Sequence, residues 1–215
     1  MIQEIGLQNS IFNQFLREVR DEKIQTDRAR FRRNLERLGE IFAYEISKKL
    51  EYEVVDVTTS LGSASMRVPK QYPVLATIMR AGLPFHQGML NYFDHADSAF
   101  VSAYRMHSKD EGDFKVEVDY MSCPDLDKRE LILVDPMLAT GSSMVKVHRA
   151  LLKNGAPSHN HIVTLLATKE GISLVRKNAP PNTTIWVGAI DDELTAQAYI
   201  VPGLGDAGDL CYGAK

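Results

Sequence analysis

Residues 131–155 of the chain read LILVDPMLATGSSMVKVHRALLKNG, and this stretch decides the class of fold. It opens with four apolar residues and no polar alternation, which predicts a strand buried on both faces, as in a parallel sheet. Pro136 cannot donate a hydrogen bond to a neighbouring strand, so the strand is expected to end at Asp135. A helix is predicted to begin near Ser142 and to end at Gly155. A strand, a polar loop and a helix in this order form the repeating unit of α/β proteins.

The rest of the chain repeats this alternation. Strands are predicted at residues 53–57, 72–79, 98–104, 115–121, 161–168 and 183–190, and helices at residues 85–93, 142–153 and 172–177. Residues 105–130 interrupt the alternation, and we expect a mobile loop and a β-arm there. We therefore predict a single α/β domain over residues 1–215, with a central, mainly parallel sheet flanked by helices.

Residues 1–50 are charged and are predicted to form a helical N-terminal segment. Thr26 or Asp27 is suited to cap a helix in which apolar residues recur at helical spacing. That apolar stripe consists of Phe31, Leu35, Leu38, Ile41, Phe42, Ile46 and Leu50. The basic run RARFRR, residues 28–33, belongs to the same helix. We interpret it as a solvent-facing surface, with contact to RNA or nucleotide as the alternative.

The composition argues against several classes of protein. The formal net charge of −3 provides no overall basic field for nucleic acid or for an anionic membrane. Cys123 and Cys211 are far apart in sequence and match neither a disulfide framework nor a zinc site. The first residues lack the pattern of a signal peptide, and no apolar run approaches the roughly 20 residues that span a bilayer. We therefore expect a cytoplasmic protein with no membrane partner.

The loop at residues 135–143 has the features of a phosphate site. The N-terminus of the following helix offers backbone amides and the positive end of the helix dipole. Gly141 permits close approach of the backbone, and the hydroxyls on either side of it add donors. Asp135 is placed to accept from ribose hydroxyls. The alternative is an ordinary strand, loop and helix with a serine cap, and a Walker A loop is excluded because no Gly-Lys-Ser/Thr follows the glycine.

Two arginines follow other predicted strands. Arg80 and Arg105 each stand at a strand's carboxyl end, and in an α/β sheet these ends meet at one edge, together with residues 135–143. Guanidinium groups bind a polyphosphate bidentately, so we predict that both arginines face such a ligand. The alternative for Arg80 is a simple ion pair with an acid.

A glycine-dense stretch, YIVPGLGDAGD at residues 199–209, lies near the C-terminus. It spells the dinucleotide pattern Gly-x-Gly-x-x-Gly, but too few residues follow it for the helix and strand of a βαβ unit. We therefore favour a loop whose backbone presses against a flat ligand, with Asp206 offering a carboxylate.

Taken together, IMRAGL, YR, LILVDPMLATGSS and YIVPGLGDAGD resemble the uracil phosphoribosyltransferase family in their order and spacing. The similarity extends from about Thr26 to the C-terminus, and it implies the type I phosphoribosyltransferase fold with a C-terminal uracil-binding hood at residues 191–215. It also implies a pentosyltransferase that makes UMP and diphosphate from uracil and 5-phosphoribosyl 1-diphosphate in pyrimidine salvage. Mg²⁺ is the implied cofactor, held mainly through substrate oxygens and not by protein metal ligands. Family members form dimers or higher homo-oligomers, and GTP activates some of them.

The resemblance further implies roles for individual residues. The residues expected to bind 5-phosphoribosyl 1-diphosphate are Arg80, Arg105, Asp135, Pro136, Met137, Leu138, Ala139, Thr140, Gly141, Ser142, Ser143 and Asp206. The residues expected to bind uracil are Ile200, Gly205, Asp206 and Ala207. Asp135, Arg105 and Asp206 are the implied catalytic residues, and DEGDF at residues 110–114 is a candidate lid.

Other features are interpreted more simply. Ser142 stands where the family commonly has a second glycine, and we expect phosphate binding to persist if the backbone there does not need a positive φ. We interpret residues 191–194 as a solvated loop and helix start, although their position between the last strand and the uracil loop allows a supporting role. Trp186 is interpreted as a core residue, and Cys211 as no nucleophile because it lacks a partner base. The alternative function is a nucleotide-sensing, RNA-binding regulator of pyrimidine genes on the same fold, although the net charge makes nucleic acid an unfavoured partner.

Overall fold

The computed structural model describes residues 1–107 and 114–214, except for the side chains of residues 104–107 and 114–116. At its centre is a sheet in the order β1-β10-β9-β7-β4-β5-β6, with β8 paired to β9. The strands are β1 (Ile2–Glu4), β4 (Val74–Met79), β5 (Asp97–His107), β6 (Phe114–Ser122), β7 (Glu130–Val134), β8 (Met137–Leu138), β9 (His159–Thr168) and β10 (Thr183–Asp191). Paired strands run parallel except for β5 and β6. The predicted α/β architecture is confirmed.

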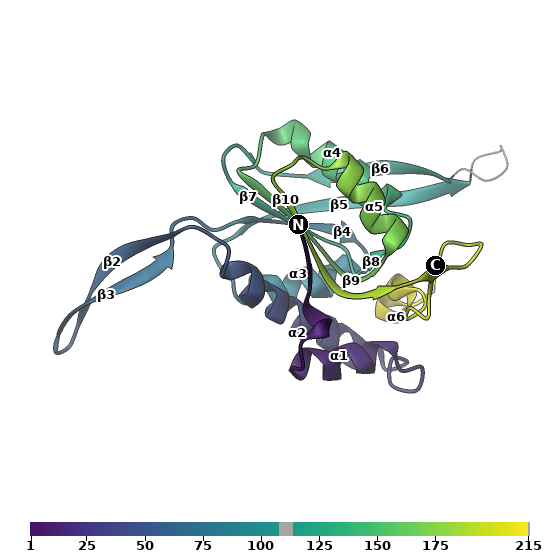
Figure 1. Ribbon diagram of the computed structural model, residues 1–215, viewed down its shortest axis with the longest axis horizontal. Coiled ribbons are helices and arrows are strands. Elements are labelled where there is room, and N and C mark those ends of the chain that lie inside the picture. The colour runs from purple at the N-terminus through teal and green to yellow at the C-terminus, as the bar shows by residue number, and fades with distance from the viewer. Residues whose placement is uncertain (108–113, 215) are drawn as a thin grey trace.

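Helices cover both faces of the sheet (Figure 1). One face carries α1 (Ile11–Arg20), α2 (Arg28–Ser47) and α3 (Gly82–Leu90), and the other carries α4 (Ser142–Leu151) and α5 (Lys169–Asn178). Short 3-10 helices occupy Ile5–Leu7 and Leu152–Asn154. The C-terminal residues form β11 (Glu193–Leu194), β12 (Ile200–Val201) and α6 (Ala207–Tyr212), which we call the hood.

An apolar core fills the space between each helical layer and the sheet. On the α1–α3 side the rings of Phe12, Phe42 and Phe85 meet edge to face at centroid distances of 5.5 and 5.3 Å. On the opposite side, α4 and α5 bury apolar residues that include Val147 and Val175. Burial of such side chains stabilises the fold by about 1.5–3 kcal/mol each. The two cores fix the sheet from both faces, so the loops at its carboxyl edge stand on a rigid base.

The long helix α2 forms where the sequence predicts it. The side chain of Asp27 caps it by accepting from the amides of Ala29 and Arg30 at 3.0 and 3.1 Å. The predicted apolar stripe is buried, except that Ile41 is half-buried. Trp186 is likewise a core residue, 3% exposed, as expected. Local capping and periodicity therefore suffice to place this helix.

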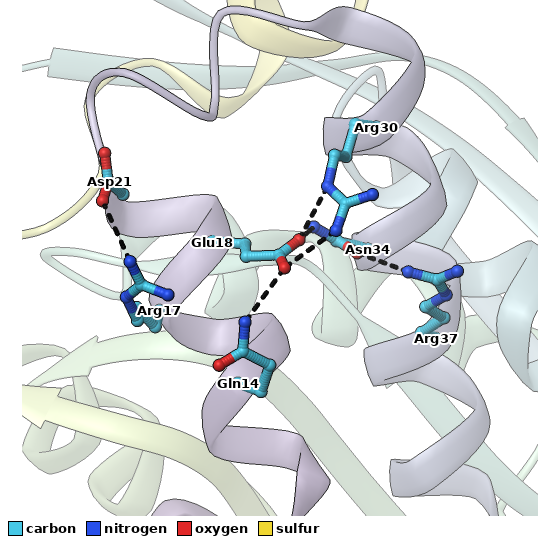
Figure 2. Close-up of polar contacts among 7 residues, drawn as sticks. All are labelled: Gln14, Arg17, Glu18, Asp21, Arg30, Asn34 and Arg37. Carbon is cyan, nitrogen blue, oxygen red and sulfur yellow. Dashed lines mark hydrogen bonds and ion pairs between the residues drawn. The ribbon is translucent and has the colours of Figure 1, made fainter.

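A buried carboxylate fastens α1 to α2 (Figure 2). Glu18 on α1 accepts from the Nε and Nη2 atoms of Arg30 at 2.9 and 2.8 Å and from Asn34 at 2.7 Å, both on α2. Gln14, one turn earlier on α1, donates to the same carboxylate at 3.1 Å. Hydrogen bonds from Arg30, followed by Asn34, lower the pKa of Glu18 to about 2. Arg30, which belongs to the basic run at residues 28–33, is thus partly exposed to solvent and also attaches α1 to α2.

The strands β2 (Tyr52–Thr59) and β3 (Gly62–Pro69) form an antiparallel hairpin that projects from the body of the protein (Figure 1). Most of its side chains are exposed, among them Val54, Leu61 and Met66. The sequence predicted a strand at residues 53–57 but not its partner, because β3 carries few β-branched residues. The strand β1 was also not predicted within the helical N-terminal segment, since three residues carry no readable period.

The segment at residues 105–130 contains the end of β5 and all of β6, which pair in antiparallel fashion. β5 and β6 pair with a register shift at Ser102 and Ala103, and β6 ends at Ser122. Residues 108–113, which contain most of the candidate lid, lie outside the described residues.

Within the described part of the chain, no helix is both long enough and apolar enough to cross a bilayer.

Candidate active site

A cavity of about 590 Å³ opens at the carboxyl edge of the sheet, beneath the hood. Three segments line it: the end of β4 with the turn into α3, the loop from β7 into α4, and residues 197–200 and 205–208 around β12 and at the start of α6. Ser102 and Ala103 of β5 complete the wall. The carboxyl ends of parallel strands are where α/β proteins bind ligands, so the position of the cavity agrees with the general rule.

The loop from β7 to α4, residues 135–143, is anchored on the neighbouring strand. The amide of Asp135 donates to the carbonyl of Val163 on β9 at 3.1 Å. The carbonyl of Pro136 accepts from two amides of β9, and β8 then pairs with β9. The hydroxyl of Thr168 donates to the carbonyl of Ala139 at 2.6 Å. The backbone of this loop is therefore fixed before any ligand arrives.

Gly141 forms the N-cap of α4 in a left-handed conformation with φ +84. A Cβ atom there would lie 2.8 Å from the carbonyl oxygen of Gly171, so the glycine is required by its φ and by its close contact. Ser142 opens α4 and is exposed, and it is not among the described non-glycine residues with positive φ. The backbone at Ser142 therefore does not need a positive φ, which was the condition under which we expected phosphate binding to persist.

Arg80 reaches into the cavity from the end of β4 and is partly exposed. Its Nη2 atom donates to the Asp209 carboxylate of α6 at 2.9 Å, and its Nη1 atom donates to the carbonyl of Gly213 at 3.3 Å. Both readings of this arginine from the sequence therefore describe part of its surroundings: it lines the cavity and it pairs with an acid. An ion pair at this level of exposure is worth about 0–1 kcal/mol, so an anionic ligand can replace Asp209.

The hood contributes backbone to the opposite wall. Ile200 is buried, whereas Gly205, with φ +90, and Asp206 are exposed at the cavity. The side chain of Asp206 caps α6 by accepting from the amide of Asp209 at 3.0 Å. The peptide bonds Met79–Arg80 and Val201–Pro202, on the two sides of the cavity, are cis. On this side the cavity is lined by residues 197–200 and 205–208, which include two glycines and two alanines.

Residues 7–214 match the family model described as uracil phosphoribosyltransferase. The chain belongs to this family. A uracil phosphoribosyltransferase from Porphyromonas gingivalis is 54% identical over 211 residues, 98% of this chain and 97% of that protein. The solved structure of the AQ2163 protein from Aquifex aeolicus is 28% identical, with a TM-score of 0.87 over 100% of this chain and 99% of that one.

The fold has a wider range than this family. A hypoxanthine phosphoribosyltransferase from Staphylococcus aureus is only 14% identical, yet the match covers 74% of each chain with a TM-score of 0.50. Such a likeness concerns the fold alone. The predicted family, its type I phosphoribosyltransferase fold and its enzyme class, a pentosyltransferase, are confirmed.

The structure brings most of the predicted site residues of this uracil phosphoribosyltransferase family member around one cavity. The residues that line it are Arg80, Asp135, Met137, Leu138, Ala139, Thr140, Gly141, Ser143, Ile200, Gly205, Asp206 and Ala207. Pro136 and Ser142 lie in the same loop but are not part of the described lining. The side chain of Arg105 lies outside the described residues, and only its backbone in β5 is placed.

Several lining residues were not predicted from the sequence. They are Ile78, Met79, Ala81, Ser102, Ala103, Met144, Gln197, Ala198, Tyr199 and Gly208. Most carry no chemistry that would single them out in a sequence. Ala198 has φ +61, an unusual conformation for alanine that composition does not reveal.

The interpretation of residues 191–194 as a solvated loop and helix start is wrong for Asp191 and for the helix start, whereas Asp192 and Glu193 are exposed as expected. Asp191 is the last residue of β10, is 7% exposed, and forms a bidentate ion pair with Arg20 of α1. Residues 193–194 form a short strand, β11. Asp192, by contrast, is exposed and pairs with Lys169. Two adjacent acids thus have opposite environments, which the DDEL sequence does not distinguish.

Cys211 belongs to α6 of the hood, and its side chain is buried. Burial raises the pKa of its thiol to about 12, so the thiol stays protonated at neutral pH. The reactive form of cysteine is the thiolate. Cys211 therefore packs as an apolar residue of the core under α6.

Proposed function

We propose that this chain transfers the 5-phosphoribosyl group from 5-phosphoribosyl 1-diphosphate to uracil, forming UMP and diphosphate in pyrimidine salvage. The observation that carries the proposal is the meeting of residues 135–143, Arg80 and residues 200–207 at one cavity. Relatives named uracil phosphoribosyltransferase, at up to 54% identity over nearly the whole chain, support it. The RNA-binding alternative receives no support from these relatives.

The ribose 5-phosphate is proposed to bind at residues 135–143. The N-terminus of α4 directs its amides and the positive end of its dipole toward the cavity side of the loop. The hydroxyls of Thr140 and Ser143 lie at the same end and can donate to phosphate oxygens. Asp135, at the end of β7, is proposed to accept hydrogen bonds from the ribose hydroxyls. The remaining residues of this loop, Pro136 and Ser142 included, shape its backbone.

Uracil is proposed to bind against the backbone of the hood, at Ile200, Gly205, Asp206 and Ala207. The edge of uracil alternates carbonyl oxygens and an N–H group, which match peptide donors and acceptors. Gly205 has no side chain, and its φ of +90 turns its peptide groups in a direction that other residues rarely adopt. Peptide groups at these positions therefore suit a small flat ring with a polar edge.

The proposed chemistry is mainly positioning and charge stabilisation. Departure of diphosphate leaves positive charge on the ribose, as in glycosyl transfer generally. The guanidinium of Arg80, and that of Arg105 by the family resemblance, are proposed to stabilise the negative charge on the leaving group. Asp135 and Asp206 hold the ribose and the nucleobase so that uracil N1 faces the reacting carbon. Residues 110–114 are proposed to exclude water, and no residue is assigned as the base for uracil.

Mg²⁺ is the proposed cofactor. The cavity offers two carboxylates, Asp135 and Asp206, on opposite walls. Hard oxygen donors suit Mg²⁺, and this ion commonly takes most of its ligands from substrate phosphates and water. The donor set therefore fits an ion held mainly through substrate oxygens. When bound, the ion would supply neutralisation of charge on the diphosphate.

The proposal extends to assembly, regulation and location. The β2–β3 hairpin exposes apolar side chains on a ribbon that has no covering layer in the described chain, which supports a homodimer or a higher homo-oligomer. GTP is proposed as an activator by resemblance to family members. A cytoplasmic location fits a phosphorylated sugar substrate and two free cysteines.

The decisive experiment measures diphosphate release from 5-phosphoribosyl 1-diphosphate and Mg²⁺ with uracil, other pyrimidines or hypoxanthine, each with and without GTP. We expect turnover with uracil only. Asp135→Asn should lower kcat by about 100-fold, since it removes an orienting carboxylate at the reacting sugar. Heat-inactivated protein gives the background. No release above that background, together with salt-sensitive RNA binding, would overturn the proposal in favour of the regulator.

A further inference from the structure

The backbone of Gly203 is held on both sides by side chains from other elements, one 12 residues away in the sequence and the other 183. Its amide donates to the Oδ2 atom of Asp191 at 3.0 Å. Its carbonyl accepts from the Nη1 atom of Arg20 at 3.1 Å. Arg20 and Asp191 in turn pair through two hydrogen bonds of 2.8 Å. We call these three residues the loop clamp.

The loop clamp combines a buried carboxylate with a partly buried guanidinium, and both side chains belong to regular secondary structure. The side chain of Asp191 is 7% exposed and that of Arg20 is 22% exposed. Asp191 ends β10, a strand of the main sheet, and Arg20 ends α1. A bidentate arginine and carboxylate pair has fixed geometry, and at low exposure it is little screened by solvent. The carboxylate and the guanidinium together present a rigid frame to one peptide of the hood.

The hood needs such a frame because its own structure is small. β11 and β12 are two residues each, and a ribbon of this size has little stability by itself. Gly203 has φ +55, and a Cβ atom there would lie 2.1 Å from the carbonyl of Ile200, so the chain folds back tightly at this point. Ile200 and Gly205, on either side of this turn, both line the cavity. The position of Gly203 therefore sets the spacing between them.

α1 is held in place by contacts that do not involve the hood. Glu18, two residues before Arg20, is locked to Arg30 and Asn34 of α2, as the dashed lines in Figure 2 show. Phe12 and Val19 bury the same helix in the core. The guanidinium of Arg20 is thus presented from an element that is anchored independently of the cavity.

We propose that Arg20 and Asp191 are positioning residues for the nucleobase half of the site, acting through Gly203 on Ile200 and Gly205. This inference rests on the proposed function, because it names uracil as the ligand of that half. Neither Arg20 nor Asp191 belongs to the described lining of the cavity, so they act on the ligand through the loop alone. The loop at residues 135–143 rests on β9 and α5 and shares none of these contacts.

The separation of the two supports predicts an unequal effect on the two substrates. Loosening the loop clamp should raise KM for uracil, because the uracil-binding backbone is displaced in ground state and transition state alike. A displacement of about 1 Å at a binding wall can cost up to about 100-fold, so we expect an increase of between about 10- and 100-fold. KM for 5-phosphoribosyl 1-diphosphate should stay within about twofold of its original value.

The test uses variants of Arg20 and Asp191 with neighbours as matched controls. Asp191→Asn is compared with Asp192→Asn, since Asp192 is the adjacent acid and is 72% exposed. Arg20→Met is compared with Arg17→Met, since Arg17 lies on the same helix and is 62% exposed (Figure 2). Arg20→Lys should restore part of the uracil affinity, because the ammonium keeps the charge but not the fork. Both control variants should behave as wild type.

Loss of folding is separated from loss of positioning by a double variant. Arg20→Met leaves the Asp191 carboxylate buried and unpaired, whereas Arg20→Met combined with Asp191→Asn removes that charge. The double variant should regain thermal stability and keep the raised KM for uracil. Hydrogen exchange at the Gly203 amide should be faster in each loop-clamp variant and unchanged in each control.

Three outcomes decide the matter. An active wild type with raised uracil KM in the stable double variant supports the inference. An active wild type with unchanged uracil KM, or with both substrate KM values raised equally, overturns it while the proposed function stands. A folded wild type that binds 5-phosphoribosyl 1-diphosphate but makes no UMP contradicts the proposed function itself, and removes the ligand that this inference names.

Discussion

The two loops that face each other across the cavity are supported in different ways. Residues 135–143 are held by the next strand and helix along the chain, and the hydrogen bond from Thr168 to Ala139 spans 29 residues. Residues 200–207 are held from the other end of the protein, and the bond from Arg20 to Gly203 spans 183 residues. The first loop is part of its own βαβ unit, whereas the second depends on the correct docking of α1.

This difference has a physical consequence for how each loop responds to change. A loop that rests on its own unit is disturbed mainly by substitutions within that unit. A loop that is supported by a distant ion pair is also disturbed by substitutions that never touch the cavity. Variants in the first loop should therefore change KM for 5-phosphoribosyl 1-diphosphate, and variants that disturb the second loop or its support should change KM for uracil.

The largest effect is expected for Gly203→Ala. The new Cβ atom would lie 2.1 Å from the carbonyl of Ile200 at a φ of +55, so the turn has to open. We expect KM for uracil to rise about 100-fold or more, because the wall itself moves. Steady-state kinetics with both substrates varied gives the measurement.

Gly205→Ala is the matched control for that variant. Its φ is +90, but a Cβ atom there meets no atom within 4 Å. Within the protein only the cost of the left-handed conformation remains, about 1–2 kcal/mol, which corresponds to about 5–30-fold if it falls entirely on uracil binding. Contact between the new methyl group and uracil would add to this loss. An unchanged KM for uracil in Gly203→Ala would contradict the role assigned to the Gly203 turn.

The next effect is expected in the other loop, for Gly141→Ala. A Cβ atom there would lie 2.8 Å from the carbonyl of Gly171 at a φ of +84. We expect KM for 5-phosphoribosyl 1-diphosphate to rise about 5–30-fold, with uracil affinity largely retained. Steady-state kinetics with each substrate varied in turn measures the two KM values separately. A selective loss of uracil binding would show that the two loops are not independent.

The sequence could predict the first loop because its support is local. An apolar strand, Pro136, a glycine and a helix start follow one another, and each signal acts within a few residues. The cap at Asp27 and the apolar stripe of α2 were predictable for the same reason. These features depend on backbone geometry and periodicity, which neighbouring residues determine.

The support of the second loop could not be predicted, because burial is decided by tertiary contacts. Asp191 and Asp192 are identical in sequence terms, yet only Asp191 faces a guanidinium from α1. Arg20 follows Arg17 by one turn and looks like another exposed helix charge. Residues 191–194 were therefore interpreted mainly as solvated, and Arg20 was not singled out at all. A long-range pair becomes visible only when the helix is docked.

A smaller effect, on stability, is expected for Glu18→Gln, which weakens the attachment of α1. The variant should lower the free energy of unfolding at neutral pH by about 1–3 kcal/mol, because hydrogen bonds to a charged acceptor are replaced by neutral ones. Urea denaturation measures the change. KM for 5-phosphoribosyl 1-diphosphate should not change, since α1 does not support residues 135–143.

The same variant tests the pH dependence of stability. In the folded protein the pKa of Glu18 lies at about 2, below its ordinary value of 4.5. A depressed pKa contributes stability that is fully present above about pH 4.5 and is lost as the pH falls toward about 2. Glu18→Gln should therefore show a shallower loss of stability across this range than wild type. Parallel curves for the two proteins would contradict the low pKa.

The smallest effect is expected for Ser142→Gly, which introduces the second glycine that the family resemblance led us to expect. Ser142 is exposed, opens α4 without a positive φ, and is not part of the described cavity lining. The change removes a hydroxyl that lies 3.3 Å from that of Thr140, and we expect both KM values to stay within about twofold.

Ser143→Ala is the informative contrast, because Ser143 does line the cavity. Loss of one hydroxyl donor there should raise KM for 5-phosphoribosyl 1-diphosphate by about 2–13-fold, the equivalent of about 0.5–1.5 kcal/mol. Ser142→Gly could instead improve 5-phosphoribosyl 1-diphosphate binding by more than Ser143→Ala weakens it. In that case Ser142 restricts the loop, and the conformation of residues 135–143 is not fixed by β9 and α5 alone.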